Sequence, residues 1–382
     1  GGSTGPACGN GTEEGAEECD DGNLRSHDGC SSGCTVETPA WNQLSPATSI
    51  PRRYYFGLAY DEQEQKTVMF GGYGPGMPIQ LKNETWTYDR GANTWALEGP
   101  VTSPSPRFSP AMAYYGSPGG QVLVHGGAAS TSAPFTTAVD SWMYTTGTGQ
   151  WATVSGTNPA GRYGSATVWE GTNNRVLLFS GRSNAGTYLN SMYEFTGTWS
   201  LIPMTGTPPA GRERASMAFD AARGKVVMFG GSDANGTLSS TYEFDVNTDT
   251  WAFINTPTDP AARNYAGMAY DPIRQVVVMH GGYNGLTDTW EYDGTDWTQI
   301  TTTTSPEDHV QMVYDVRYRR MIALEGGQTP CRTWEYRVTS SWPDEVCDAA
   351  GDEDSDGVED CGDPDCEGLP CDGGVCSGGT CQ

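Results

Sequence analysis

The feature that most constrains the fold of this chain is an internal repeat that occurs six times. Each copy contains an apolar stretch closing on an aromatic residue, an apolar stretch running into a glycine pair, and then two stretches marked by Trp or Tyr. The closing aromatic residues, spaced 44 to 55 positions apart, are Tyr60, Tyr114, Trp169, Phe219, Tyr270 and Tyr314. A period of this length indicates that each copy is one supersecondary unit of a larger array.

The four stretches of a copy have the pattern of a four-stranded antiparallel sheet. The composition favours strands and turns over helices, with 51 Gly, 24 Pro and 19 Tyr. We expect the glycine pair to lie where the chain leaves the sheet and a side chain would obstruct the turn. The third copy departs from the pattern, because Ser180 replaces the first glycine and the turn at 195–199 is short. We expect its loop to differ and its sheet to be retained.

This pattern resembles the kelch repeat, whose signature is a hydrophobic strand closing on Gly-Gly followed by spaced Tyr and Trp. The resemblance covers residues 41–342 and implies an all-β fold, a six-bladed kelch β-propeller of four-stranded blades. A closed ring leaves no blade with an exposed flank. The segment 41–44 has the pattern of an extra fourth strand, so we expect Trp41 to close the ring against the sixth blade. Trp342 is the competing candidate for that place.

Charge and cysteine content separate the two ends from the middle. Residues 1–40 contain eight acids and one base, and residues 343–382 contain thirteen acids and no base, which leaves a net charge of −6 for the remainder. Four cysteines lie in the first segment and six in the last. Short Cys-rich segments without a hydrophobic core indicate a disulfide framework in an oxidising compartment. Zinc is the alternative, but it requires tetrahedral Cys and His sets, and the two ends offer only His27.

These features predict an extracellular or cell-surface protein. The chain starts at Gly1 without Met, as expected of a form secreted through a removed signal sequence. No stretch approaches the roughly 20 apolar residues of a membrane span. Phosphate binding needs clustered Lys and Arg, which the acidic ends lack, and this argues against nucleic acid as a partner. The cysteines number eleven, and we predict that Cys331, alone in the middle segment, is the single free thiol.

The N-terminal segment 1–40 is similar to a short Cys-rich repeat of proteins secreted by myxobacteria. The resemblance is carried by Cys8-Gly9-Asn10-Gly11, by Glu18-Cys19-Asp20-Asp21 and by Asp28-Gly29-Cys30. With Cys34, the segment has four cysteines, which allow three disulfide connectivities. The sequence leaves all three open.

The C-terminal segment 343–382 contains a candidate calcium loop. Residues 352–363 place oxygen ligands at loop positions 1, 3, 5, 9 and 12, a main-chain carbonyl at 7 and a glycine at 6; the predicted ligands are Asp352, Asp354, Asp356, Val358, Asp360 and Asp363. Calcium takes six to eight oxygens, and the glycine permits the sharp turn. The loop resembles the Asp-rich calcium loops of thrombospondin type 3 repeats. We therefore predict calcium as cofactor, with an acidic disulfide loop that binds no ion as the alternative.

A regularly spaced arginine is the candidate binding feature of the propeller. It stands seven residues before the closing aromatic residue of the first five copies, as Arg53, Arg107, Arg162, Arg212 and Arg263, and Glu307 takes the place in the sixth. In kelch domains that bind acidic peptides, arginines at comparable places grip carboxylates, and the planar guanidinium suits that task. The alternative hypothesis is that each arginine pairs with a neighbouring backbone group or acid inside the blades.

Catalysis is not predicted. Copper radical oxidases resembling galactose oxidase share the kelch propeller but need a Tyr-Cys cross-link and two His around one metal. Cys331 does not fit that place, and His125 and His280 fall in blades that face each other across the ring. We predict a non-enzymatic scaffold that binds protein or glycan through loops such as 73–84 and 128–139. A self-assembling subunit of an extracellular filament or surface layer, joined head to tail, is the second hypothesis; a propeller enzyme of unknown reaction is the third.

Overall fold

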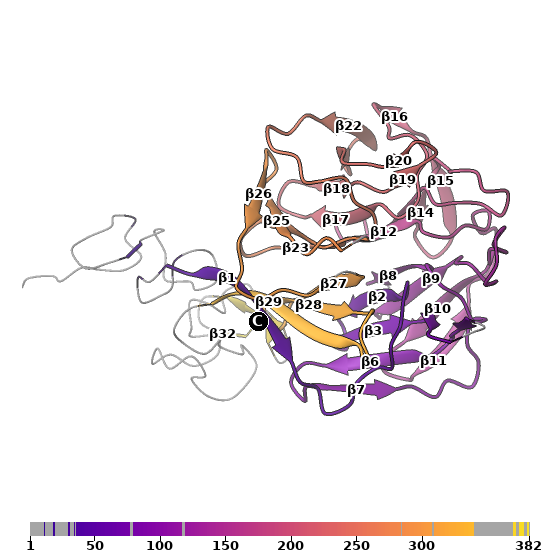
Figure 1. Ribbon diagram of the computed structural model, residues 1–382, viewed down its shortest axis with the longest axis horizontal. Coiled ribbons are helices and arrows are strands. Elements are labelled where there is room, and N and C mark those ends of the chain that lie inside the picture. The colour runs from indigo at the N-terminus through magenta and orange to yellow at the C-terminus, as the bar shows by residue number, and fades with distance from the viewer. Residues whose placement is uncertain are drawn as a thin grey trace, which may run out of the picture.

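The computed structural model describes residues 36–339, apart from 77–78, 117–118, 284 and 308. Outside this range it describes Gly11, Glu18, Cys19, Cys30 and Cys34, and the backbone of 370–371, 374–377 and 380–381. The regular elements in the described residues are all β-strands. Six sheets form a ring, and the innermost strand of each sheet faces the middle (Figure 1). The predicted all-β, six-bladed propeller is confirmed.

Each of the first five blades is one continuous stretch of chain that runs outward from the channel. Blade one contains β2 (Gly57–Asp61), β3 (Lys66–Phe70), β6 (Thr85–Asp89) and β7 (Thr94–Leu97). Blade two contains β8 (Ala111–Tyr115), β9 (Gln121–His125), β10 (Ser141–Thr145) and β11 (Gln150–Thr153). Blade three contains β12 (Ala166–Glu170), β13 (Arg175–Phe179), β14 (Met192–Phe195) and β15 (Trp199–Ile202).

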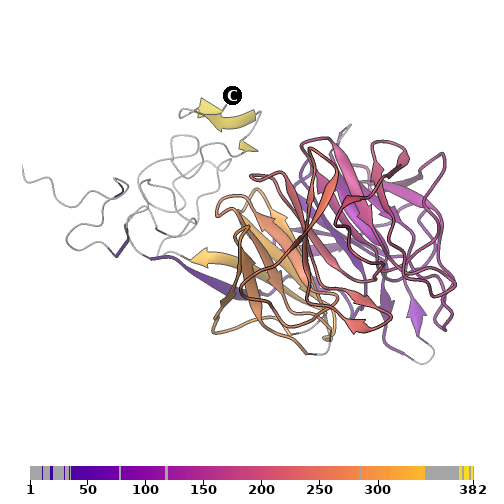
Figure 2. The same ribbon diagram turned by 90° about the horizontal axis from the view of Figure 1, so that it is seen from above.

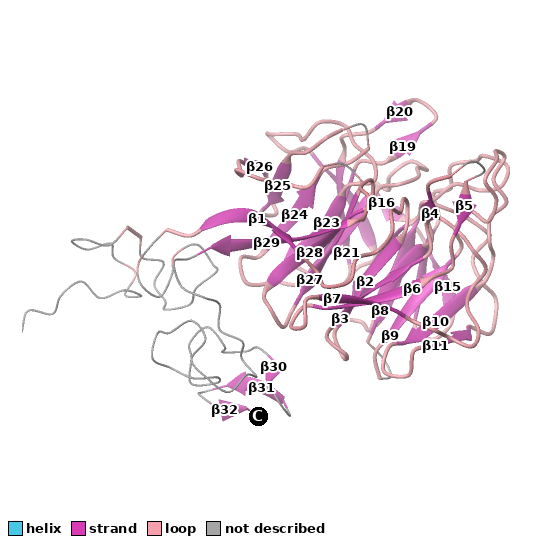
Figure 3. Cartoon of the chain, turned by 60° about the horizontal axis from the view of Figure 1, so that its bottom comes forward, coloured by secondary structure: helices cyan, strands magenta, loops and turns pink. Residues whose placement is uncertain are grey.

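Blade four adds a short parallel strand to the common pattern. It contains β17 (Ser216–Asp220), β18 (Lys225–Phe229), β21 (Thr241–Asp245) and β22 (Thr250–Ile254), with β16 (Thr205–Gly206) beside β22. Blade five contains β23 (Gly267–Asp271), β24 (Val276–His280), β25 (Thr289–Tyr292) and β26 (Trp297–Ile300). Short hairpins β4 (Tyr73–Gly74) with β5 (Gln80–Leu81) and β19 (Ser232–Asp233) with β20 (Gly236–Thr237) lie on one side of the ring (Figure 3). Near the C-terminus are β30 (Pro370–Cys371), β31 (Gly374–Ser377) and β32 (Thr380–Cys381).

Blade six is built from both ends of the propeller. It contains β27 (Val310–Asp315), β28 (Arg320–Glu325), β29 (Arg332–Thr339) and, as its outermost strand, β1 (Thr38–Leu44). The ladder between β1 and β29 places Trp41 opposite Tyr336, and the two strands lie side by side (Figure 2). Trp41 is buried and closes the ring as predicted, whereas Trp342 lies outside the described residues. Strand β1 begins at Thr38, three residues before the boundary expected at 41.

The hydrophobic core is divided among the contacts between neighbouring blades. Each pair of adjacent blades shares one apolar cluster, such as Phe179 and Met192 of blade three against Met228 and Trp251 of blade four. Burial of both faces of every blade explains why the second strands are continuously apolar instead of alternating.

A tryptophan on each outermost strand ties its blade to the preceding one. In five blades its indole nitrogen donates to a Thr or Ser hydroxyl at 2.8 to 3.0 Å; the pairs are Trp41 with Thr289, Trp95 with Thr333, Trp151 with Thr85, Trp199 with Ser141, and Trp297 with Thr241. A buried indole N–H needs such a partner. The tryptophan that recurs in the sequence therefore links neighbouring blades.

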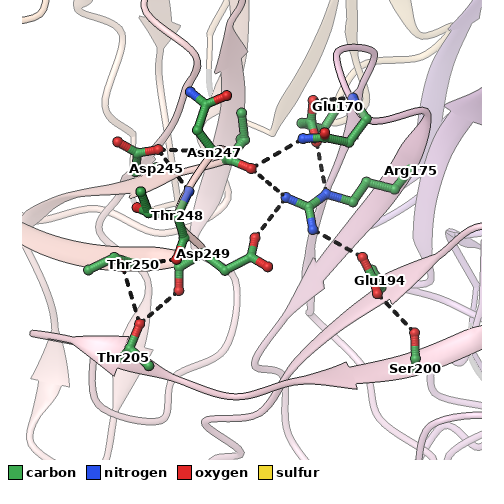
Figure 4. A network of polar contacts seen from close by, with 12 residues as sticks. Glu170, Arg175, Glu194, Ser200, Thr205, Asp245, Asn247, Thr248, Asp249 and Thr250 are labelled. Carbon is green, nitrogen blue, oxygen red and sulfur yellow. Dashed lines mark hydrogen bonds and ion pairs between the residues drawn. The ribbon is translucent and has the colours of Figure 1, made fainter.

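Arg175 makes a further tie between blades three and four (Figure 4). It is buried and pairs with Glu170 and Glu194 of its own blade at 2.8 and 3.0 Å. Its remaining nitrogen donates to the Val246 carbonyl and to Asp249 of the next blade. This fully bonded guanidinium is part of the frame.

The glycine pairs lie where the second strand leaves the blade, as predicted. Gly230 has a φ of +68°, and a Cβ placed on it would lie 2.3 Å from the carbonyl oxygen of Arg263 in the next blade. The chain of one blade therefore passes too close to its neighbour for a side chain there. In blade three Ser180 adopts the same left-handed conformation, and its hydroxyl accepts from the Arg212 amide at 2.8 Å. The substitution is accommodated, and the blade keeps its four strands.

Candidate functional site

The five repeat arginines lie inside the blades. Each is at most 3% exposed, and each donates to the carbonyl of the first residue of its own blade's glycine pair at 2.9 to 3.1 Å. These pairs are Arg53 with Gly71, Arg107 with Gly126, Arg162 with Ser180, Arg212 with Gly230, and Arg263 with Gly281. The arginines therefore hold the loop that follows the second strand.

A second contact occupies the outer end of each guanidinium. The residue just before the third strand accepts from it; these acceptors are Glu84, Asp140, Ser191, Ser240 and Asp288. Of the two hypotheses that the sequence left open, the one in which the arginines pair inside the blades fits this geometry. The five repeat arginines are therefore not part of the interaction surface that we propose.

The residues two positions after the repeat arginine form a ring around the channel. In all six blades this residue has a φ between +46° and +64°; the residues are Tyr55, Ser109, Gly164, Arg214, Tyr265 and His309, which we call the loop mouth. The backbone amides of Ser109, Gly164, Arg214 and Tyr265 each donate to the carbonyl of the preceding member at 2.6 to 3.0 Å. Residues other than glycine rarely adopt this backbone conformation, and backbone strain of this kind is concentrated at functional sites.

Arg214 is the one arginine of the loop mouth. Its guanidinium lies over the ring of Tyr265 at 4.8 Å and over Tyr55 at 5.7 Å. Its Nε is 3.7 Å from the Glu213 carboxylate and has no hydrogen-bond partner among the described residues. The Tyr265 hydroxyl is hydrogen-bonded to Ser109. Arg214 is thus partly buried and contacts two aromatic rings, and its guanidinium has N–H donors that the described residues do not use.

Two hollows meet at Arg214. One of about 130 Å³ lies in the channel, and one of about 260 Å³ lies beside it. The second is lined by Tyr73 and Ile79 of the loop 73–84 and by Thr131 and Phe135 of the loop 128–139. The two loops that the sequence analysis singled out therefore converge on the same arginine.

An aromatic cluster surrounds these hollows. Tyr55, Tyr73 and Phe108 pack in succession with ring centroids 5.5 to 5.6 Å apart, and Phe135 lies 5.2 Å from Phe108. The rings leave apolar surface at the mouth, where Ile79 and Tyr283 are each 40% exposed. Aromatic walls around a partly buried cation are typical of sites where binding energy is concentrated.

The repeat also agrees with a known protein family. The sequence profile of the KLHDC2/KLHL20/DRC7 Kelch-repeats domain matches residues 117–327. This chain belongs to the kelch-repeat family. The match covers blades three to five completely and blades two and six in part. No curated protein matches the chain at a significant level.

Arg214 was not predicted from the sequence, although the kelch repeat contains a signal for it. The position of Arg212 holds arginine in five blades because every blade needs the same brace. The position of Arg214 holds a different side chain chemistry in nearly every blade, while its backbone conformation stays constant. Positions that vary against a constant backbone are those that the fold leaves free for binding.

Both buried histidines of the kelch blades have packing roles. His125 forms a hydrogen bond with the Ser141 hydroxyl at 2.9 Å, and His280 forms hydrogen bonds with the Thr289 hydroxyl and the Pro306 carbonyl. Burial, the first cause in each case, lowers the pKa of His125 to about 3 and that of His280 to about 4. The described residues contain no cluster of three or more metal-ligating side chains. The predicted calcium ligands Asp352, Asp354, Asp356, Val358, Asp360 and Asp363 lie outside the described residues.

The cysteines of the described residues fall into two kinds. Cys19 and Cys30 form a disulfide, one pairing within the N-terminal segment. Cys331 is a buried free thiol whose pKa burial raises to about 12, so it is neutral and unreactive near neutral pH. Its expected state as a free thiol is confirmed. The described part of the chain also contains no helix with the length and apolarity of a membrane span.

Proposed function

We propose that this kelch propeller is a non-enzymatic scaffold that binds an extended protein segment at the loop mouth, with a ligand carboxylate seated on Arg214. The observation that carries the proposal is the contrast between Arg214 and the five repeat arginines. Each of their guanidinium groups donates to a carbonyl of the frame, whereas the Arg214 guanidinium makes no hydrogen bond to the described residues and pairs only with Glu213, at 3.7 Å. A buried donor without a partner is costly unless a ligand supplies one.

A carboxylate is the group that best satisfies Arg214. The guanidinium fork matches a carboxylate in two parallel hydrogen bonds, and such bonds are stronger when water is excluded. The neighbouring Tyr55, Tyr73 and Phe135 would bury an apolar side chain adjacent to that carboxylate. The expected motif is therefore an acidic residue next to an aromatic or aliphatic one.

Selection from a displayed library of random ten-residue peptides tests this proposal. Peptides recovered on the wild-type protein should be enriched in Asp or Glu beside an apolar residue, and Arg214→Gln should weaken their binding by about tenfold or more, as expected for hydrogen bonds to a charged group. Arg332→Gln is the matched control, because Arg332 is a partly exposed arginine that pairs with Glu307. Equal binding by wild-type and Arg214→Gln proteins would refute the proposal.

The same experiment includes a glycan arm. An oligosaccharide containing glucuronate presents the same carboxylate without a peptide backbone. Binding of this probe in place of any peptide, with the same loss in Arg214→Gln, would assign the site to a glycan.

We also propose an extracellular or cell-surface location for this scaffold, with calcium in its C-terminal segment. The Cys19–Cys30 disulfide supports an oxidising compartment, where such bonds persist. Fractionation of the source cells followed by immunoblotting is the direct test, and recovery in the cytoplasmic fraction alone would overturn the location.

Self-assembly is a second candidate function, favoured by charge. The segment 343–382 has thirteen acids and no base, and it could serve as the carboxylate-bearing ligand of another copy's loop mouth. Light scattering of the full chain and of a variant lacking residues 347–382 distinguishes the two functions. Salt-sensitive association that disappears both in this variant and in Arg214→Gln supports assembly, because exposed charge contacts weaken as ionic strength rises.

A further inference from the structure

At the opposite end of the channel lies a further hollow, and one aromatic side chain from every blade contributes to its wall. Its volume is about 420 Å³, within the size range of small-molecule sites, and its aromatic residues are Tyr60, Tyr114, Trp169, Phe219, Tyr270 and Tyr314. These are the residues that close the innermost strands. We call this hollow the aromatic cup.

The aromatic cup is separated from the loop mouth by a waist in the channel. The same six side chains line both the cup and the channel hollow at Arg214; they are Leu58, Met112, Thr167, Met217, Met268 and Met312. Four of these are methionines, whose flexible side chains fill such constrictions well. The two mouths are therefore distinct sites, and a ligand of one does not contact Arg214 from the other.

Glu62 is the one charged side chain among the described residues that line the aromatic cup. The arginines of the adjoining turns in blades four and five are paired with acids. Arg223 pairs with Asp220 and Glu243, and Arg274 pairs with Asp271 and Glu291, each at 2.5 to 2.9 Å. The single charge among the described lining residues is therefore negative.

The surroundings of Glu62 favour a positively charged ligand. Its side chain is open to solvent, yet the walls of the cup remove part of its hydration, and this burial, with Asp61 next to it, raises the pKa of its carboxyl. A carboxylate in such a place is stabilised by a nearby cation. The aromatic rings add to this, because a cation over an aromatic face is attracted by the ring quadrupole.

The cup has few hydrogen-bond acceptors to offer a primary ammonium, which brings three donors. The Tyr60 hydroxyl is buried where it donates to Asp315 at 2.8 Å, the hydroxyl oxygens of Tyr270 and Tyr314 are buried as well, and Trp169 and Phe219 provide no acceptor. A quaternary ammonium has no N–H donor and is bound by carbon contacts and charge alone. From this combination of aromatic wall, single carboxylate and scarce acceptors, we infer that the aromatic cup binds a small quaternary ammonium compound.

Isothermal titration with choline tests this inference on the full chain. Choline should bind with saturation at one site per chain, whereas its neutral carbon isostere, 3,3-dimethylbutan-1-ol, should bind more weakly or not at all. Trp169→Leu should weaken choline binding by about threefold to thirtyfold, the range of one cation–π contact. Glu62→Gln should weaken it by about twofold to fivefold, because the carboxylate is accessible to solvent.

Glu64→Gln is the matched control, since Glu64 belongs to the same turn but does not line the cup. Its choline affinity should equal that of the wild type, as should that of Arg214→Gln, which alters only the other mouth. Chemical shifts of the Met methyl groups at the waist report the location of binding and the folded state of each variant. Absence of saturable choline binding, equal binding of the isostere, or affinity unchanged in both cup variants would overturn the inference.

Discussion

Arg212 and Arg214 stand two residues apart on one turn, yet their guanidinium groups have opposite surroundings. Arg212 is 3% exposed and donates to the carbonyls of Gly230 and Ala210 and to the hydroxyl of Ser240. Arg214 lies over two tyrosine rings, and its Nε makes no hydrogen bond among the described residues, only an ion pair with Glu213 at 3.7 Å. The first belongs to the frame of blade four, and the second belongs to the channel mouth.

This pair supplies a matched test of structure against binding. Arg212→Gln should lower the free energy of unfolding by about 2 to 4 kcal/mol, because buried acceptors lose their donor. Arg214→Gln should lower it less, by about 1 to 2 kcal/mol, because it loses two cation–π contacts and a 3.7 Å ion pair with Glu213 but no guanidinium hydrogen bond. Urea unfolding followed by tryptophan fluorescence measures both values. A larger loss in Arg214→Gln than in Arg212→Gln would contradict the division of roles.

Gly230 is expected to tolerate no side chain. Gly230→Ala should destabilise the protein by about 2 to 4 kcal/mol, because it combines a left-handed backbone with a clash against the Arg263 carbonyl. Gly99 is the control, since a Cβ there would meet no atom within 4 Å. Gly99→Ala should leave the melting temperature unchanged or slightly raised. Equal melting temperatures of the two variants would show that the blade contact at Gly230 is not tight.

His125 should make the protein sensitive to acid. Burial, with Arg162 nearby, lowers its pKa from 6.5 to about 3. Between these two pH values His125 is neutral in the folded protein and protonated in the unfolded chain. The stability due to neutral His125 is therefore complete above pH 6.5 and is lost as the pH falls from 6.5 toward 3.

Replacement of His125 by phenylalanine isolates this effect, since Phe70, Phe179 and Phe229 occupy the equivalent place in other blades. The free energy of unfolding should decrease between pH 7 and pH 4.5 in both proteins. This decrease should be smaller in His125→Phe than in the wild type, by about 2 kcal/mol. An identical decrease in both proteins would assign the acid sensitivity to other groups.

The calcium loop should respond to chelation independently of the propeller. Removal of calcium should abolish or lower a thermal transition of the segment 343–382 and leave the propeller transition unchanged, because a small segment without a core depends on its ion and disulfides. Calorimetry with calcium and with EGTA measures this. Asp356→Asn should abolish the heat of calcium binding, while Asp344→Asn, outside the loop, should not. A calorimetric profile indifferent to EGTA would contradict the prediction.

The fold could be predicted from the sequence because every blade requires the same residue types at the same positions. The glycine pair, the outer Trp and the closing aromatic residue recur since every blade meets its neighbours in the same geometry. Trp41 was recognisable because it supplies a fourth-strand aromatic for blade six, a place for which Trp342 was the alternative. Repetition thus identified the frame well.

The binding surface was harder to predict for the same reason. Regular spacing drew attention to Arg53 and its equivalents, but spacing does not reveal whether a guanidinium reaches a carbonyl of its own blade. That depends on the path of the loop after the second strand. Arg214 occurs once and breaks the repeat, so only the folded ring shows that it meets Tyr55 and Phe135 from blades one and two.

The pairing of β1 with β29 has a mechanical consequence. Because the strands are antiparallel and Thr38 lies opposite Thr339, the flanking segments leave the ring from the same end of one ladder. Tension that draws those segments apart loads the Thr38–Thr339 pair first and then each following pair in turn, toward Leu44 and Thr333. The ring would therefore open like a zipper at blade six, whereas a pull along the strands would load all these pairs together.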